Sequence, residues 1–121
     1  MIIKKCFILS AVFSLKEGAK DEIASKMEEI LNKRKDKQPL EFPSAGSAFK
    51  RPEGYFAAAL IDECSLKGLR VGGASVSNKH AGFIVNDRGA TSNEVKALFE
   101  KVARTVYEQK GVALEPEVRF L

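Results

Sequence analysis

Apolar positions in the first third of the chain predict a strand followed by a helix. Residues 6–15 are apolar at most positions, which suits a strand of a buried sheet. A secretory signal peptide is the alternative, since two lysines precede this run, although no small-residue cleavage site follows it. Residues 17–35 begin with acidic and end with basic side chains, as the helix dipole favours. Their apolar side chains recur on one helical face, at Ile23, Met27, Ile30 and Leu31.

The middle of the chain predicts a loop, a helix and two strands. Residues 38–54 contain three of the four prolines and are expected to form a loop with short extended pieces. A second helix is predicted over residues 55–64. Apolar runs at residues 69–76 and 83–85 predict two strands that are joined by a turn.

The last helix has the clearest start and stop signals. Thr91 and Glu94 have the spacing of a capping box, and Gly111 is expected to end the helix. A closing strand is predicted over residues 117–120. The fold class is therefore α+β, with three helices packed on a small, mostly antiparallel sheet. The buried stripe predicted for the last helix consists of Val95, Leu98, Phe99, Val102 and Val106.

Composition limits the chain to one globular domain of ordinary character. It has 121 residues, of which 45% are hydrophobic and 30% charged, and this excludes a disordered tail or a collagen-like repeat. The net charge of +4 is compatible with nucleic acid as a binding partner. The basic cluster at residues 33–37 is interrupted by Asp36 and is typical of a helix end, so no nucleic-acid partner is expected. The apolar run near the start is too short to span a bilayer, so no membrane partner is expected.

The two cysteines indicate neither a disulfide scaffold nor a metal site. Cys6 and Cys64 lie far apart in the sequence, and each is surrounded by apolar residues, as is typical of a free thiol in a core. With His80 as the single histidine, no zinc-ligand set can be assembled. A reducing, cytoplasmic location is the expectation.

Several residues are candidates for chemistry, and each has a plainer structural alternative. Gly68, Gly72 and Gly73 do not form a phosphate loop, so tight turns and close backbone packing are favoured. His80 is a candidate general base, although a lone histidine is more often structural. Ser47 lies among small residues, where its hydroxyl faces either a ligand or a turn.

Two glutamates near the end of the chain form another candidate. Glu115 and Glu117 flank a proline and would share one face of a strand. Paired carboxylates on one face raise each other's pKa, which suits acid–base chemistry. Two solvated surface glutamates are the alternative.

Five ordered motifs extend across residues 37–121. They are PSAGSAFKRP at 43–52, LID at 60–62, LKGLRVGGASVSNKHAGFIVN at 66–86, GAT at 89–91 and LEPEVRF at 114–120. Together they resemble the C-terminal, substrate-binding domain of UDP-N-acetylenolpyruvoylglucosamine reductases, the MurB family of peptidoglycan precursor synthesis. The short connection between Pro52 and Tyr55 is similar to the branch of that family without a long insertion. Residues 1–36 resemble, more weakly, the last strand and helix of the preceding flavin-binding domain.

The resemblance implies a function. Members of the family use FAD and NADPH to reduce UDP-N-acetylglucosamine enolpyruvate to UDP-N-acetylmuramate. The chain would then supply the substrate site and the proton donor of such a flavoenzyme. Neither FAD nor NADPH is expected to bind this chain alone, and without the flavin-binding domain as partner the chain is expected to be inactive. A free-standing nucleotide-sugar-binding domain without redox activity is the alternative function. Self-association through the exposed N-terminal strand or helix is also expected.

The resemblance also assigns roles to five residues. Ser47 matches the serine of the family that donates the proton, and Glu117 matches its catalytic glutamate. Lys37 matches a lysine that contacts the uridine diphosphate. Lys50 and Arg51 follow the serine motif and are assigned to substrate binding, where a cation suits a diphosphate.

Overall fold

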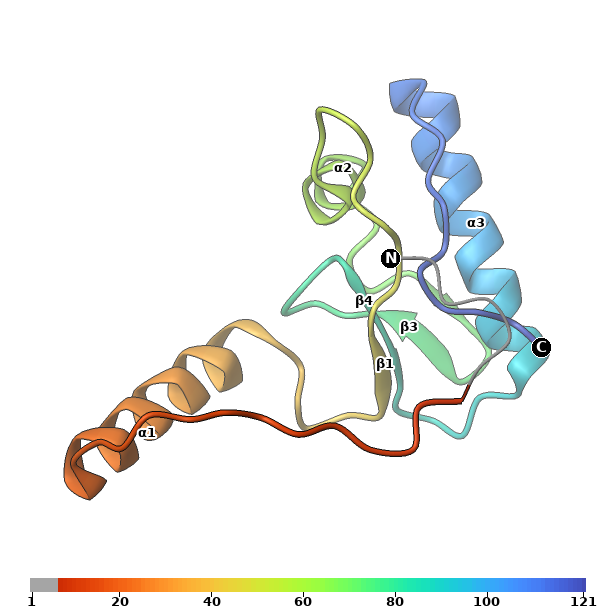
Figure 1. Ribbon diagram of the computed structural model, residues 1–121. Helices are drawn as coiled ribbons and strands as arrows, with labels where there is room; N and C mark the ends of the chain where they lie inside the picture. The colour runs from red at the N-terminus through yellow and green to blue at the C-terminus, as the bar shows by residue number, and fades with distance from the viewer. Residues whose placement is uncertain (1–6) are drawn as a thin grey trace.

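Four short antiparallel strands form one sheet, in the order β1-β4-β3-β2, and two helices pack on it (Figure 1). The computed structural model describes residues 7–121. The elements are α1 (Lys20–Lys37), β1 (Ser44–Ser47), α2 (Ala57–Glu63), β2 (Arg70–Val71), β3 (Ala74–Val76), β4 (Phe83–Asn86) and α3 (Ser92–Lys110). The predicted α+β class, with three helices and a small antiparallel sheet, is confirmed.

Helix α3 supplies the largest part of the core. Its side chains Leu98, Val102 and Val106 are fully buried against the sheet and α2. The predicted capping box is present, because the Thr91 hydroxyl accepts a hydrogen bond from the backbone N–H of Glu94 and the Glu94 carboxylate accepts one in return. The helix ends at Gly111, as predicted, with that residue in the left-handed conformation. The predicted stripe is buried except for Val95, which is half-buried.

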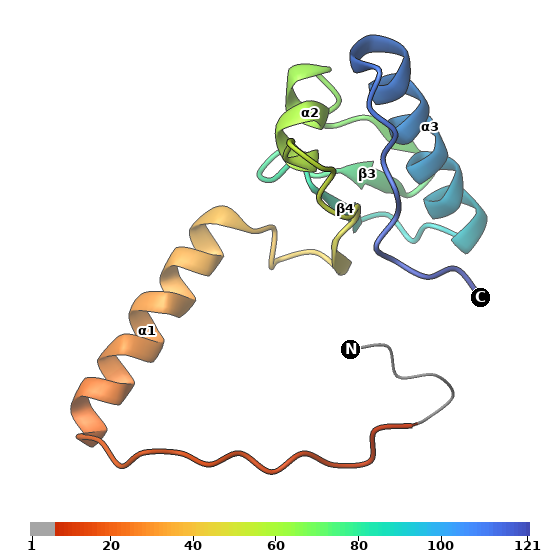
Figure 2. The ribbon, with the colours of Figure 1, turned by 45° about the horizontal axis from the view of Figure 1, so that its top comes forward.

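Helix α2 covers the same face of the sheet beside α3 (Figure 2). It begins one or two residues later than the predicted start at Tyr55 or Phe56, because Phe56 is its N-cap and has an extended backbone. At the other end, the thiol of Cys64 is free and buried, as expected of a cysteine in a core. The corresponding expectation for Cys6 lies outside the described residues.

The prediction of one strand over residues 69–76 is wrong, because the chain reverses in the middle and forms the hairpin β2–β3. The reversal lies at Gly72, whose φ of +53° is accessible mainly to glycine. A Cβ atom on Gly73 would lie 2.4 Å from the backbone nitrogen of Ala90. The expectation of tight turns and close backbone packing is therefore confirmed at these two glycines.

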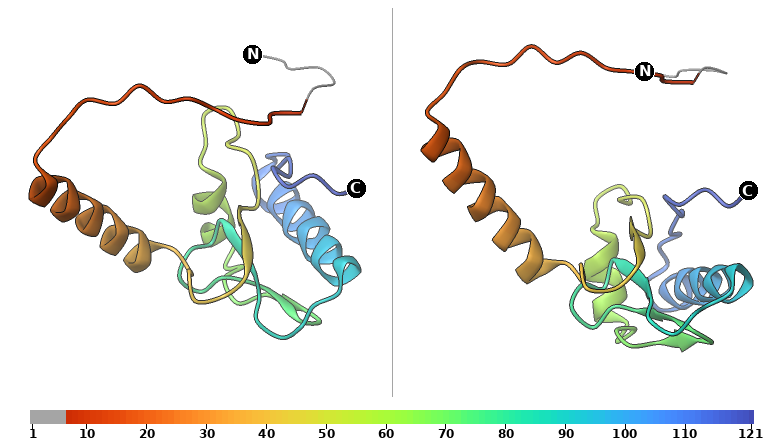
Figure 3. Two further views of the ribbon diagram at one scale, coloured as in Figure 1. Left: turned by 60° about the horizontal axis from the view of Figure 1, so that its bottom comes forward. Right: turned by 90° about the horizontal axis from the view of Figure 1, so that it is seen from below.

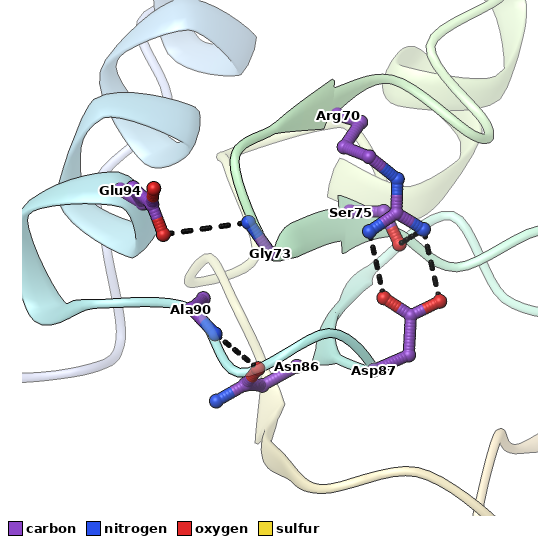
Figure 4. Close-up of polar contacts among 7 residues, drawn as sticks. All are labelled: Arg70, Gly73, Ser75, Asn86, Asp87, Ala90 and Glu94. Carbon is purple, nitrogen blue, oxygen red and sulfur yellow. Dashed lines mark hydrogen bonds and ion pairs between the residues drawn. The ribbon is translucent and has the colours of Figure 1, made fainter.

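The hairpin is tied to the strand beside it by a partly buried ion pair (Figure 4). Arg70 donates from Nη1 to Oδ1 of Asp87 over 2.8 Å and from Nη2 to Oδ2 over 2.9 Å. These hydrogen bonds hold the pKa of the Asp87 carboxyl below its ordinary value. Because Asp87 follows directly after β4, this two-point contact fixes the end of the strand that pairs with β1.

The start of α3 is tied to the same hairpin (Figure 4). The carboxylate of Glu94 accepts hydrogen bonds from the backbone N–H groups of Thr91, over 2.9 Å, and Gly73, over 3.3 Å. Both hydrogen bonds lower the pKa of the Glu94 carboxyl, and the one from Thr91 has the larger effect. Asn86 holds the intervening loop, since its Oδ1 accepts from the N–H of Ala90 over 2.7 Å. The hairpin, β4 and α3 are thus joined into one scaffold.

The segment before the sheet extends away from this scaffold. In the right view of Figure 3, α1 and the chain leading into it lie apart from the sheet and the other helices. The predicted strand is wrong for its described part, since residues 7–15 have no regular structure and Val12 is 98% exposed. A strand needs a neighbour to satisfy its backbone hydrogen bonds, and within residues 7–121 no strand pairs with this segment.

Helix α1 forms where predicted, but none of its residues is buried. Its apolar face, defined by Ile23, Met27, Ile30 and Leu31, is exposed to solvent. Its last turn contains basic residues, as the dipole argument predicts. As far as the structure describes the chain, no helix is both long and apolar enough to cross a membrane.

The prediction of a closing strand over residues 117–120 is also wrong. This part of the chain makes one isolated bridge, between Phe49 and Pro116, and then turns away. The ladder does not continue, because the N–H of Ala48, which would form the next bond to this segment, bonds to the carbonyl of Gly82 instead. Phe120 instead packs edge-on against Phe99, with ring centroids 5.2 Å apart.

Candidate functional site

Backbone pairing brings two distant segments together at the end of β1. Ala48 donates its N–H to the carbonyl of Gly82 over 2.8 Å, and its own carbonyl accepts the N–H of Glu117 over 2.9 Å. One step further, the N–H of Lys50 bonds to the carbonyl of Glu115 over 2.8 Å. Ser47 and Glu117, which are far apart in the sequence, therefore lie close to each other and to the turn before β4.

A cavity of about 300 Å³ opens at this junction and contains three of the residues predicted from the sequence. Ser47, Arg51 and Glu117 all line it. A second hollow of about 250 Å³ shares Ser47 and Glu117, so these two residues connect the hollows. The remaining lining of the larger cavity consists of Phe49, Phe56, Ala57, Ala58, His80 and Gly82.

The polar groups of Ser47 and Glu117 are available to a ligand. Within residues 7–121, no side chain or backbone group forms a hydrogen bond with the Ser47 hydroxyl, and no cation forms an ion pair with Glu117. The neighbouring carboxylate differs, because Glu115 accepts a hydrogen bond from Nζ of Lys50 over 2.7 Å. The two glutamates flanking Pro116 thus have separate surroundings, and only Glu117 faces the cavity.

Two of the residues assigned to substrate binding lie elsewhere. Lys50 is outside the cavity lining and forms its ion pair with Glu115 on the surface. Lys37 is the last residue of α1 and is also outside the lining. Their assignment to substrate binding stays a prediction. A ligand larger than the cavity would extend beyond its lining residues.

Sequence reasoning left His80 as a lone histidine, but the structure brings it into the cavity lining. Nδ1 of its ring accepts the N–H of Gly82 over 3.0 Å, so the neutral ring carries its proton on Nε2. The ring also packs on Phe83, with centroids 4.8 Å apart. The position of His80 beside Ser47 and Glu117 depends on the pairing of Gly82 with Ala48, so spacing in the sequence gave no signal for it.

Phe56 is the second cavity residue that the sequence did not single out. Its ring lies beneath the guanidinium of Arg51, with Cζ of the arginine 4.1 Å from the ring centroid. An arginine followed five positions later by an aromatic residue carries no recognisable pattern, so the contact becomes visible only in three dimensions.

A further, apolar hollow of about 290 Å³ is lined by residues of β1, β4 and α3. Among its lining residues are Pro43, Val95, Phe99 and Val118, and none of the lining residues is titratable. Within the described part of the chain, no group of three or more histidine, cysteine, aspartate or glutamate side chains is arranged to hold a metal ion. Among the described residues, the cavity at Ser47 is lined by a guanidinium without an ion-pair partner, that of Arg51, and this group suits an anionic ligand.

Comparison with known proteins agrees with the sequence motifs. Residues 38–121 match the family model described as UDP-N-acetylenolpyruvoylglucosamine reductase, C-terminal domain. A reductase of that name from Lachnoclostridium phytofermentans is 53% identical over 118 residues, which is 98% of this chain and 38% of the relative. The chain belongs to the UDP-N-acetylenolpyruvoylglucosamine reductase family.

Further relatives support the same placement in the reductase family. The reductase from Clostridium botulinum strain Alaska E43 is 51% identical over 121 residues, covering 99% of this chain and 40% of the relative. The crystal structure of the MurB reductase from Thermus caldophilus superimposes with a TM-score of 0.71 and 44% identity, over 88% of this chain and 37% of that one. The chain thus spans about two fifths of the length of the curated reductases that it matches.

Proposed function

We propose that this chain supplies the substrate site and the proton donor of a reductase that converts UDP-N-acetylglucosamine enolpyruvate to UDP-N-acetylmuramate. The observation that carries the proposal is the convergence of Ser47, Arg51 and Glu117 on one cavity. Ser47 and Arg51 were assigned roles from the motif at residues 43–52, and Glu117 from the motif at residues 114–120. The names of the relatives and of the matching family model support the same reaction.

The reaction adds a hydride and a proton across the carbon–carbon double bond of an enolpyruvyl ether. In this proposal the hydroxyl of Ser47 gives its proton to carbon, and solvent then restores the proton. A serine hydroxyl is a weak acid, so its effect depends on being held against the reacting carbon. The absence of a hydrogen bond to this hydroxyl from any residue in the range 7–121 leaves it free for that contact.

Glu117, Arg51 and His80 are proposed to bind and polarise the substrate. Glu117 would stabilise the enol-like intermediate that follows hydride addition and precedes protonation on carbon. The guanidinium of Arg51 suits the diphosphate, because its planar N–H groups match phosphate oxygens. His80 would offer its Nε2–H as a hydrogen-bond donor, since its Nδ1 is already engaged by the backbone of Gly82.

The hydride must come from a group held outside this chain, because no side chain can donate one. In the proposed enzyme FAD supplies it after reduction by NADPH. The described residues do not fit this cofactor: the hairpin glycines Gly72 and Gly73 pack against Ala90 and Glu94 and do not form a turn that cradles a pyrophosphate. We therefore propose that FAD and NADPH bind to the part of the enzyme that this chain does not cover, and that the chain alone is inactive.

Residues 1–36 are proposed to belong to the flavin-binding domain, and residues 37–121 to form the substrate-binding domain. The family model begins at residue 38, whereas the relatives match nearly the whole chain. The exposed apolar face of α1 and the exposed segment before it are suited to packing against that domain. Without it, the same surface would favour self-association. The proposed location is the cytoplasm.

A chimaeric enzyme tests the proposed function. The matching residues of the Lachnoclostridium phytofermentans reductase are replaced by this chain, and NADPH consumption is measured with UDP-N-acetylglucosamine enolpyruvate. We expect substrate-dependent consumption by the chimaera and none by the chain alone. A folded chimaera that binds flavin but consumes no NADPH would contradict the proposal. If that chimaera still bound the nucleotide sugar, the result would favour a binding domain without redox activity.

A further inference from the structure

Arg51 is held at the cavity by an aromatic ring instead of a carboxylate. Its guanidinium lies over the face of Phe56, 4.1 Å from the ring centroid. Within residues 7–121 it forms no ion pair, whereas nearby Lys50 is paired with Glu115 and Arg70 with Asp87. The charge of Arg51 is therefore oriented by the ring and left free for an anion.

Phe56 occupies an unusual position for a large apolar side chain. It is the N-cap of α2, with an extended backbone, and it is 61% exposed. The buried side chains of that helix are those of Ala57, Leu60 and Ile61. The ring of Phe56 thus contributes little to the core, and the contacts that the structure gives it are with the cavity and Arg51.

We propose that Phe56 is the positioning residue for Arg51, holding the guanidinium so that its N–H groups are presented to the diphosphate of a nucleotide sugar. The inference rests on the proposed function, because it takes the cavity to be the nucleotide-sugar site. Phe56 acts through Arg51 and does not itself contact the diphosphate.

The geometry supports this division of roles. A guanidinium attracted to an aromatic face lies against the ring and keeps its N–H groups free at its edges. Those edges are the part that forms paired hydrogen bonds with phosphate oxygens. An arginine side chain in solution has several rotatable bonds, so holding it in one orientation before binding lowers the entropy lost when the ligand arrives.

The inference is tested by titrating UDP into the 121-residue chain and following the amide signals around the cavity by NMR. We expect Phe56→Ala to weaken UDP binding about 3- to 30-fold, the range that a cation–π contact of this kind supports. Phe56→Tyr keeps an aromatic face and is expected to bind nearly as well as the unsubstituted chain. Tyr55→Ala removes the adjacent exposed aromatic side chain, which is outside the cavity lining, and serves as the matched control.

The double variant separates positioning from direct contact. If Phe56 acts through Arg51, then Phe56→Ala causes no further loss in a chain that already carries Arg51→Ala. An equal loss in both backgrounds, or no loss in either, would overturn the inference while leaving the proposed function intact. Failure of the unsubstituted chain to bind UDP would count against the proposed nucleotide-sugar site and against the inference that rests on it.

Discussion

In the chimaeric reductase, we expect Ser47→Ala to slow reoxidation of the reduced flavin by UDP-N-acetylglucosamine enolpyruvate about 10²- to 10⁴-fold, the range typical of a general acid. Reduction of the flavin by NADPH should be nearly unchanged. The asymmetry follows from the proposed role, because only the half-reaction that forms UDP-N-acetylmuramate needs a proton delivered to carbon. Ser47 lies at the cavity with its hydroxyl free, so its removal takes away the donor and leaves the fold intact.

The two half-reactions are measured separately by stopped-flow absorbance of the flavin. Ser44→Ala is the matched control, because Ser44 lies in the same strand but lines the apolar hollow instead. We expect that control to retain both rates. An equal loss in both half-reactions of Ser47→Ala would identify this serine as structural and remove it from the chemistry.

The second large effect is expected for Glu117→Gln, which keeps the size of the side chain and removes its charge. Flavin reoxidation should slow about 10²- to 10³-fold, because the carboxyl group that is proposed to stabilise the enol before its protonation is lost. Binding of UDP-N-acetylglucosamine enolpyruvate should weaken much less, since the proposed role of this carboxylate belongs to the chemical step.

Glu115→Gln is the matched control, because it makes the same change two residues earlier in the chain. Glu115 is exposed and paired with Lys50, and it is outside the cavity lining. An exposed ion pair contributes little to stability, so this variant should keep both rates. Similar losses in the two variants would show that the effect arises from general disturbance of the chain around Pro116, and the catalytic role of Glu117 would be refuted.

Local signals in the sequence predicted those parts of the fold that depend on neighbouring residues. The capping box at Thr91 and the stop at Gly111 are present because each depends on contacts within one or two helical turns. The apolar stripe of α3 is predictable because its spacing follows the period of the helix itself. The hairpin at Gly72 was missed because a short apolar run with central glycines fits one interrupted strand as well as two short ones.

Features that depend on distant contacts could not be predicted in this way. The apolar run in residues 7–15 has the pattern of a buried strand, but a pattern does not supply the neighbouring strand that it needs. The closing strand failed for a related reason, since the pairing stops after a single bridge between Pro116 and Phe49, and the N–H of Ala48 bonds to Gly82 instead. In both cases composition favoured a strand and the available hydrogen-bonding partners decided against it.

The candidate site also combines residues that the sequence identified with residues that only the three-dimensional structure reveals. Motif resemblance selected Ser47, Arg51 and Glu117, and the structure brings all three to one cavity. The contribution of His80 required the pairing of Gly82 with Ala48, and that of Phe56 required the start of α2 to fold against the loop that carries Arg51. Residue types and their spacing in the sequence carry no information about such contacts between segments.

The central claim is that the cavity at Ser47 binds the substrate, and an NMR titration of the chain with UDP-N-acetylglucosamine enolpyruvate tests it most directly. We predict saturable shifts of the amide signals of Ser47, Arg51, His80 and Glu117, with the signals of residues 20–33 in α1 unchanged. Shifts confined to the apolar hollow near Phe99 or to α1, or no shift of the cavity amides at any substrate concentration, would contradict the claim.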